Sequence, residues 1–144
     1  MKEEDTVKLL RECDSGVKMG VASIDEVLDN VGAPSLKQRL EQCKEEHQRL
    51  GNEVQAMLRS RRDQGKEPSP MAKSMSWLRT NVMLTVKKDD ATVADLMTDG
   101  CNMGVKSLHR YLNQYQEADA ASRDVARRLI GAEESLIREL RPYL

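Results

Sequence analysis

The chain has 144 residues and a formal net charge of −1 at pH 7, with 33% charged and 39% hydrophobic residues. This balance argues against bulk nucleic acid or an anionic membrane surface as a partner, and no apolar run is long enough to span a membrane. There is no phenylalanine and only one tryptophan, and this composition favours helix over sheet. The length suits a single domain with one sizeable core.

The three cysteines are a small and odd number, so they do not indicate a disulfide framework. The chain begins with the charged stretch Met1-Lys2-Glu3-Glu4-Asp5, which is not the pattern of a signal peptide. We therefore expect a cytoplasmic protein whose thiols are reduced.

Hydrophobic periodicity predicts two helices in the first half of the chain, over about 5–31 and about 35–64. Between them lies Gly32-Ala33-Pro34-Ser35, where glycine is typical of a helix end and proline of the next helix's first turn. The second helix has an unbroken spacing of four and three residues between its inward positions. These positions are Leu36, Leu40, Cys43, His47, Leu50, Val54 and Met57.

The stretch Lys66-Glu67-Pro68-Ser69-Pro70 interrupts the helical pattern. A shorter helix is predicted after it, over about 71–87, with Trp77 beside its apolar stripe and at the bundle surface. Two more helices are predicted over about 91–116 and about 120–142.

A short stretch in the middle of the first helix recurs in the helix over 91–116. Met19-Gly20-Val21-Ala22-Ser23 is followed 84 positions later by Met103-Gly104-Val105-Lys106-Ser107. The apolar positions around it recur with the same offset, as Ile24 and Leu108 illustrate. This agreement indicates a duplicated helical hairpin.

Short turns join the two helices of each hairpin, so we expect both hairpins to be antiparallel. The connection between the hairpins contains its own helix of about 17 residues, which spans about 25 Å and can return the chain along the bundle. The sequence therefore predicts one all-α domain over residues 1–144. It is a four-helix bundle with an internal pseudo-two-fold axis and a helical crossover, the topology of ferritin-like proteins.

The connection and the following helix carry a more specific resemblance. Ser69-Pro70-Met71-Ala72 leads to Trp77-Leu78, Lys88-Asp89-Asp90 precedes Leu96, and Gly100-Cys101-Asn102-Met103 follows. With these residues the chain resembles an uncharacterised bacterial branch of the ferritin-like four-helix-bundle superfamily. The resemblance covers most of the chain. It implies the fold but no activity, because none is assigned to that branch.

The ligands of a ferritin-like di-iron site are not in the places where such a site needs them. It takes a glutamate from each of two helices and a Glu-x-x-His pair from each of the other two. Here Lys44 stands three residues before His47, and the last helix has no histidine. Gly20 and Gly104 occupy the middle of the other two helices. We therefore expect no iron storage, no oxygen chemistry and no cofactor.

A different set of side chains could bind a soft metal ion near the bundle centre. Cys43 and His47 lie four residues apart on one inward face, and Cys101 is inward on the helix over 91–116. Thiolate and imidazole are ligands of Zn²⁺ or Cu⁺, with Glu133 or Glu134 as a fourth. Buried cysteine also packs as a small hydrophobic residue, and we favour packing over a metal site.

The two central glycines also allow two interpretations. Glycine at these positions lets helices approach closely or leaves room for neighbouring methionine side chains. Alternatively, Gly20 and Gly104 border a pocket for an apolar small molecule, lined by Met19, Met103 and Leu50.

We identify no catalytic residues, since there is no glycine-rich phosphate loop and no Ser/His/Asp arrangement. The expected function is that of a non-catalytic interaction or assembly protein, with a second copy or another protein as partner and the Trp77 side as contact surface. The alternative is soft-metal binding or sensing by Cys43, His47 and Cys101. A weaker alternative is apolar small-molecule binding at the level of Gly20 and Gly104.

Overall fold

The computed structural model describes residues 2–69, 73, 84 and 89–144. Within this part of the chain there are helices and no strand, so the predicted all-α class is confirmed. The helices are α1 (Lys2–Leu28), α2 (Pro34–Arg59), α4 (Asp90–Gln114), α5 (Ala120–Leu140) and the short 3₁₀ helix η1 (Arg141–Tyr143). The helix predicted over 71–87, including Trp77, lies outside the described residues except for Lys73 and Leu84.

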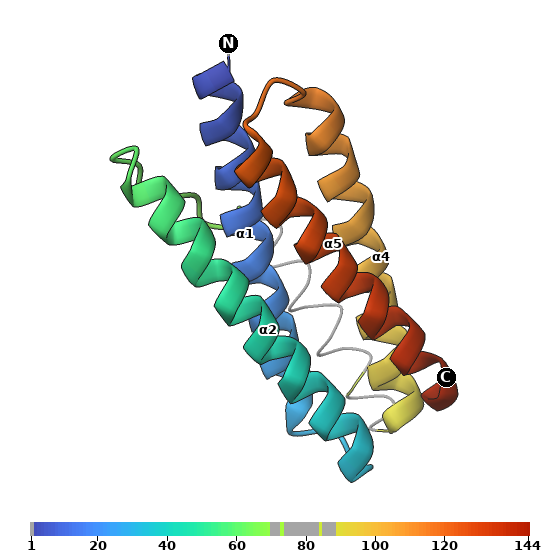
Figure 1. The fold of residues 1–144 in the computed structure, drawn as a ribbon. Coiled ribbons are helices and arrows are strands. Elements are labelled where there is room, and N and C mark those ends of the chain that lie inside the picture. The colour runs from blue at the N-terminus through green and yellow to red at the C-terminus, as the bar shows by residue number, and fades with distance from the viewer. Residues whose placement is uncertain (1, 70–72, 74–83, 85–88) are drawn as a thin grey trace.

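The four long helices form a bundle, as predicted (Figure 1). α1 packs against α2 and α4, and α5 packs against the same two helices. α1 and α5 also contact each other across the bundle. Because α1 and α5 run one way while α2 and α4 run the other, the helices that lie side by side are antiparallel, whereas the diagonal pair α1 and α5 is parallel (Figure 1).

Local sequence signals explain where the helices start. Pro34 stands in the first turn of α2, where its missing N–H is not needed. Asp89 caps α4 by accepting a hydrogen bond of 2.8 Å from the N–H of Thr92. Asp119 caps α5 in the same way through the N–H of Ser122, also at 2.8 Å.

The end of α2 differs from the prediction, because the helix stops at Arg59 instead of continuing to about residue 64. The chain then turns, with φ of 56° at Arg62 and 87° at Gly65. The buried carboxylate of Asp14 on α1 accepts a hydrogen bond of 2.9 Å from the N–H of Lys66. A side chain on Gly65 would collide with this carboxylate. The segment thus binds α1 through its backbone, which a continued helix could not do.

Hydrogen bonds also tie the second hairpin to the first at both ends of the bundle. Asp90 accepts from the N–H groups of Gly32 (2.7 Å) and Ala33 (3.0 Å), at the turn between α1 and α2. At the opposite end, the N–H of Asp119 donates to the hydroxyl of Thr6 over 2.8 Å. The chain therefore leaves α2 near the start of α1 and enters α4 at the other end of the bundle (Figure 1).

The core consists of two apolar clusters separated by a central level. On each helix one member of each cluster flanks this level. The flanking pairs are Val17 and Ile24 on α1, Leu50 and Cys43 on α2, Leu108 and Cys101 on α4, and Ala132 and Leu136 on α5. The central level is therefore the place where the apolar seam of every helix is interrupted.

Candidate functional site

A buried histidine and a buried glutamate occupy the level between the two apolar clusters. His47 lies on α2 and Glu133 on α5, and their side chains are 3% and 10% exposed. The atoms Nε2 of His47 and Oε1 of Glu133 are 3.6 Å apart. We name these two residues the central pair. A buried ionisable group requires a partner, and each member supplies one to the other.

The central glycines make room for the central pair. A Cβ atom on Gly20 would lie 2.8 Å from Cδ2 and 3.0 Å from Nε2 of His47. A Cβ atom on Gly104 would lie 2.5 Å and 2.7 Å from the two carboxylate oxygens of Glu133. Each polar side chain thus lies against the backbone of the preceding helix of its own hairpin. A side chain larger than hydrogen would fit at Gly20 or Gly104 only if His47 or Glu133 moved.

The internal repeat relates these two contacts. Gly20 and Gly104 are 84 positions apart, and His47 and Glu133 are 86 positions apart. The buried positions of α2 and α5 share that second offset, as Leu36/Ser122, Leu40/Ala126, Cys43/Leu129, Leu50/Leu136 and Val54/Leu140 show. The two glycine-bordered side chains therefore occupy corresponding sequence positions of the two hairpins, and they face each other.

The contacts of His47 determine its protonation. Nδ1 lies 2.9 Å from the backbone carbonyl oxygen of Cys43, which can only accept a hydrogen bond, so Nδ1 carries a proton. Nε2 faces the carboxylate of Glu133. Burial lowers the pKa of His47, but its interactions with Cys43 and Glu133 outweigh that effect and raise the pKa to about 10. At neutral pH the central pair is thus an imidazolium facing a carboxylate.

The carboxylate of Glu133 is only partly satisfied. Its distance of 3.6 Å from Nε2 is that of an ion pair rather than of a hydrogen bond. Its other oxygen, Oε2, is buried and has no hydrogen-bond partner. The imidazolium of His47 is therefore the group on which the buried charge of Glu133 depends.

Two of the three buried thiols, those of Cys43 and Cys101, flank the central pair. Cys43 Sγ lies 3.5 Å from Nδ1 of His47. Burial raises the pKa of Cys101, and the nearby Glu133 and Cys43 add to that shift. Cys13 lies elsewhere, in the cluster that contains Val17, and burial raises its pKa to about 12. A protonated thiol is a weak nucleophile and a weak metal ligand.

The predicted metal ligands come together only in part. Cys43 and His47 are in contact, and the carboxylate beside them is that of Glu133. Glu134 is exposed, because successive helical residues point about 100° apart. The prediction that Glu134 could be the fourth metal ligand is therefore wrong. Among the described residues, no group of three or more His, Cys, Asp or Glu side chains is placed to hold a metal ion. The donor set does not fit a di-iron centre either, since Gly20 and Gly104 stand at the middle of α1 and α4.

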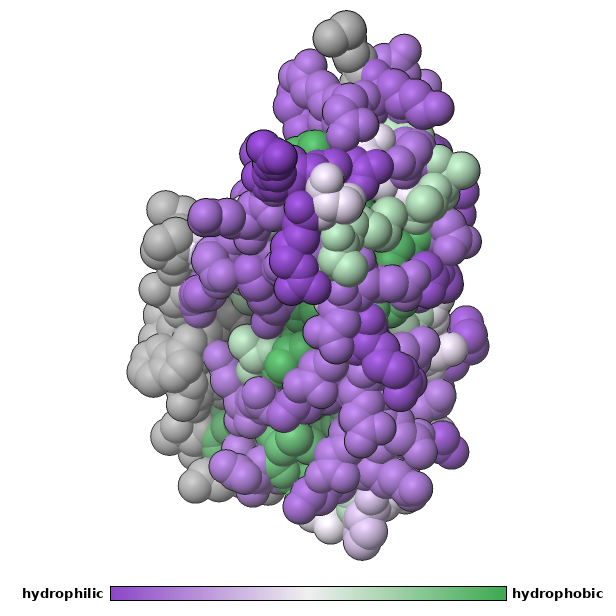
Figure 2. Space-filling model, turned by 60° about the vertical axis from the view of Figure 1, so that its left-hand side comes forward, coloured by the Kyte–Doolittle hydropathy of each residue, from purple (hydrophilic) through white to green (hydrophobic). Residues whose placement is uncertain are grey.

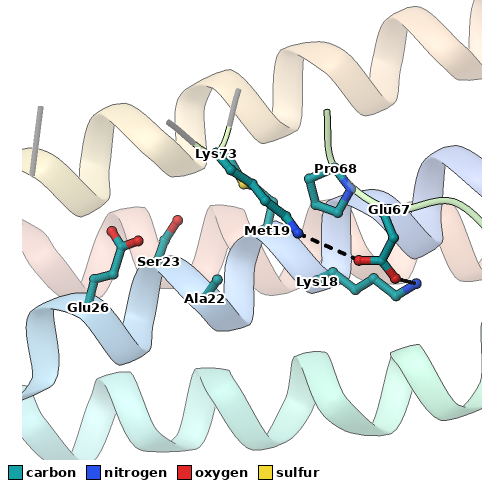
Figure 3. Close-up of a pocket in the computed structure, with 8 residues that line it drawn as sticks. All are labelled: Lys18, Met19, Ala22, Ser23, Glu26, Glu67, Pro68 and Lys73. Atoms are coloured by element: carbon teal, nitrogen blue, oxygen red, sulfur yellow. Dashed lines mark hydrogen bonds and ion pairs between the residues drawn. The ribbon is translucent and has the colours of Figure 1, made fainter. Parts of the chain in front are cut away.

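The interpretation of an apolar pocket at the central glycines is also corrected. The space beside Gly20 and Gly104 is taken by the central pair, and Met103 is 69% exposed. A hollow of about 430 Å³ lies instead beside α1 (Figure 3). Its lining consists of Lys18, Met19, Ala22, Ser23, Glu26, Glu67, Pro68 and Lys73. Glu67 forms ion pairs with both lysines, so most of the charge in this hollow is balanced internally.

Comparisons of the chain with protein-family models, with curated proteins and with solved structures found no match. In the described ranges, no helix combines the length and the apolar character needed to cross a membrane.

Proposed function

We propose that the chain is a non-catalytic helical bundle of ferritin-like topology that acts in protein assembly or interaction. The observation that carries this proposal is that both members of the central pair are buried and face each other. A catalytic acid or base has to contact its substrate, and a bound small molecule needs a concave site. His47 and Glu133 face each other inside the core, where a buried polar contact acts on how helices pair.

The course of the chain supports the ferritin-like part of the proposal. α2 ends at one end of the bundle, and α4 begins at the other (Figure 1). Opposite ends for these two termini are what the single long crossover of ferritin-like bundles requires.

Soft-metal binding is the competing function, and the contact between Cys43 and His47 favours it. Coordination by Nδ1 would break its hydrogen bond to the carbonyl of Cys43. Coordination by Cys101 requires a thiolate, whereas the surroundings of Cys101 raise its pKa. Because of both obstacles, protein assembly or interaction by a metal-free bundle is the better-supported function.

The experiment combines elemental analysis with light scattering, on protein purified without a chelator and on the variant Cys43→Ser. We expect no stoichiometric metal in either sample and a mass that rises above one chain with increasing concentration. Metal near one ion per chain, lost in Cys43→Ser, would establish the competing function. A mass of one chain at every concentration would remove assembly between copies from the proposal.

A further inference from the structure

The internal repeat gives α1 and α4 a matching pair of surface residues. Met19 and Ser23 on α1 recur as Met103 and Ser107 on α4. On α1, this pair lines the hollow whose other wall is formed by Glu67, Pro68 and Lys73 (Figure 3). On α4, Met103 is 69% exposed, the highest exposure among the large hydrophobic side chains that the structure describes. In the first hairpin, other residues of the chain thus face this surface, namely Glu67, Pro68 and Lys73. In the second hairpin, Met103 at the corresponding surface is exposed.

Charged residues are ordered along the open face of α4. Asp95 and Asp99 precede Met103, whereas Lys106 and Arg110 follow it, and all four are exposed. The spacings of 4, 4, 3 and 4 residues between these positions keep them on one face of the helix. The face is therefore acidic on one side of Met103 and basic on the other.

We propose that this face of α4 binds the same face of a second copy of the chain, with the two α4 helices antiparallel and Met103 of both copies at the two-fold axis. This proposal rests on the proposed assembly function and names its partner and surface. An isologous contact brings each surface patch against its own copy. An antiparallel arrangement therefore places the acidic half of one α4 against the basic half of the other.

Charge order also selects against other arrangements. A parallel contact would place acidic residues against acidic residues and basic against basic, which is unfavourable. In the antiparallel contact, Asp95 of one copy lies near Arg110 of the other. The two-fold axis produces this ion pair twice.

The size of the surface predicts a weak dimer. α4 has 25 residues, which gives a length of about 37 Å. One helix face of this length buries an area at the low end of specific interfaces. Its ion pairs are exposed at the rim, so salt will screen them. We expect a reversible dimer that dissociates further as the salt concentration rises.

Sedimentation equilibrium of the full chain at low and high salt tests this surface. The variant Arg110→Asp replaces two attractive contacts with two repulsive ones, and we expect it to weaken the dimer at low salt by about tenfold. The exchange variant Asp95→Arg/Arg110→Asp should restore dimerisation, because it reverses both sides of the contact. The matched control is Arg49→Asp, the same charge change at an exposed position of α2, and it should leave the dimer unchanged.

Two outcomes overturn the proposal and are distinguishable from each other. If the wild type dimerises and Arg110→Asp has no more effect than Arg49→Asp, or the exchange variant fails to recover, the α4 surface is wrong while assembly stands. If the wild type is monomeric at every concentration, both this surface and assembly between copies fail. Circular dichroism and thermal unfolding of each variant will confirm that the bundle remains folded.

Discussion

At the scale of single residues, His47 and Glu133 depend on each other because both are removed from water. Removing one member of a buried ion pair leaves the other charge without compensation, which is costlier than replacing both by apolar residues. Glu133 is the more dependent member, since its Oε2 has no other partner.

Replacing Glu133 alone should therefore destabilise the bundle more than replacing both residues. We expect Glu133→Leu to lower the free energy of unfolding by about 3 kcal/mol and the double variant His47→Leu/Glu133→Leu to lower it by less. Urea unfolding of the wild type, both single variants and the double variant measures this coupling. The control is Glu134→Leu, an exposed neighbour, with an expected change within about 0.5 kcal/mol. Additive effects of the two single variants would contradict a coupled pair.

The raised pKa of His47 gives the stability a defined pH dependence. Between the ordinary pKa of 6.5 and the folded-state pKa of about 10, the folded chain keeps a proton that the unfolded chain releases. The stabilisation by this pair is thus complete below about pH 6.5 and is lost as pH rises toward 10.

The comparison that isolates this effect uses the variant His47→Gln. The difference in unfolding free energy between the wild type and His47→Gln should fall as pH rises from about 6.5 to about 9, by at most about 1.4 kcal/mol per pH unit. The other ionisable groups near His47 are Cys43, Glu133 and Cys101, and the variant retains all three. A difference that stays constant over this range would contradict a charged His47.

At the scale of helices, the central glycines Gly20 of α1 and Gly104 of α4 act differently from Gly131 of α5. Ala is favoured over Gly inside a helix by about 0.5–1 kcal/mol. At Gly20 and Gly104 this gain is opposed by a collision with the central pair, whereas a Cβ atom on Gly131 meets nothing within 4 Å. The same substitution should therefore have opposite signs at these positions.

We expect Gly20→Ala and Gly104→Ala to lower the melting temperature and Gly131→Ala to raise it. Gly131→Ala is the matched control, because it reports the helix propensity without a collision. Differential scanning calorimetry of the three variants measures the effect. If all three raised the melting temperature, the fit between the glycines and the central pair would be wrong.

The elements were predictable from the sequence to the extent that their causes are local. The spacing of Leu36, Leu40 and Cys43 and the caps at Asp89 and Asp119 required no tertiary information. The end of α2 depends on the hydrogen bond from Lys66 to Asp14, which lies some 50 residues away in the chain. Local periodicity cannot predict such a contact.

The candidate site was predictable only in part, for the same reason. His47 stands on an unbroken apolar seam. Glu133 also fits such a seam, four residues after Leu129 and three before Leu136, but a glutamate is exposed by default. Only the packing of α2 against α5 brings the two together, and that packing is what distinguishes Glu133 from Glu134.

At the scale of the whole molecule, the bundle has two apolar clusters with the central pair between them. Its surface is mostly hydrophilic on the face shown in Figure 2, with smaller apolar areas among the polar side chains. Ion pairs such as Glu53–Arg128 cross the contact of α2 with α5 at the surface. Such exposed pairs contribute little to stability, so the burial of both clusters is what holds the hairpins together.

The equivalence of His47 and Glu133 has a consequence for how such a chain can be built. Two identical hairpins related by a true two-fold axis carry the same residue on both sides of that axis. Their meeting point would be imidazolium against imidazolium or carboxylate against carboxylate, and a buried contact of like charges is unfavourable. Opposite charges at this point require two unequal halves. Joining both halves in one polypeptide therefore permits opposite charges at two equivalent positions, where a symmetric pair of hairpins would carry the same residue twice.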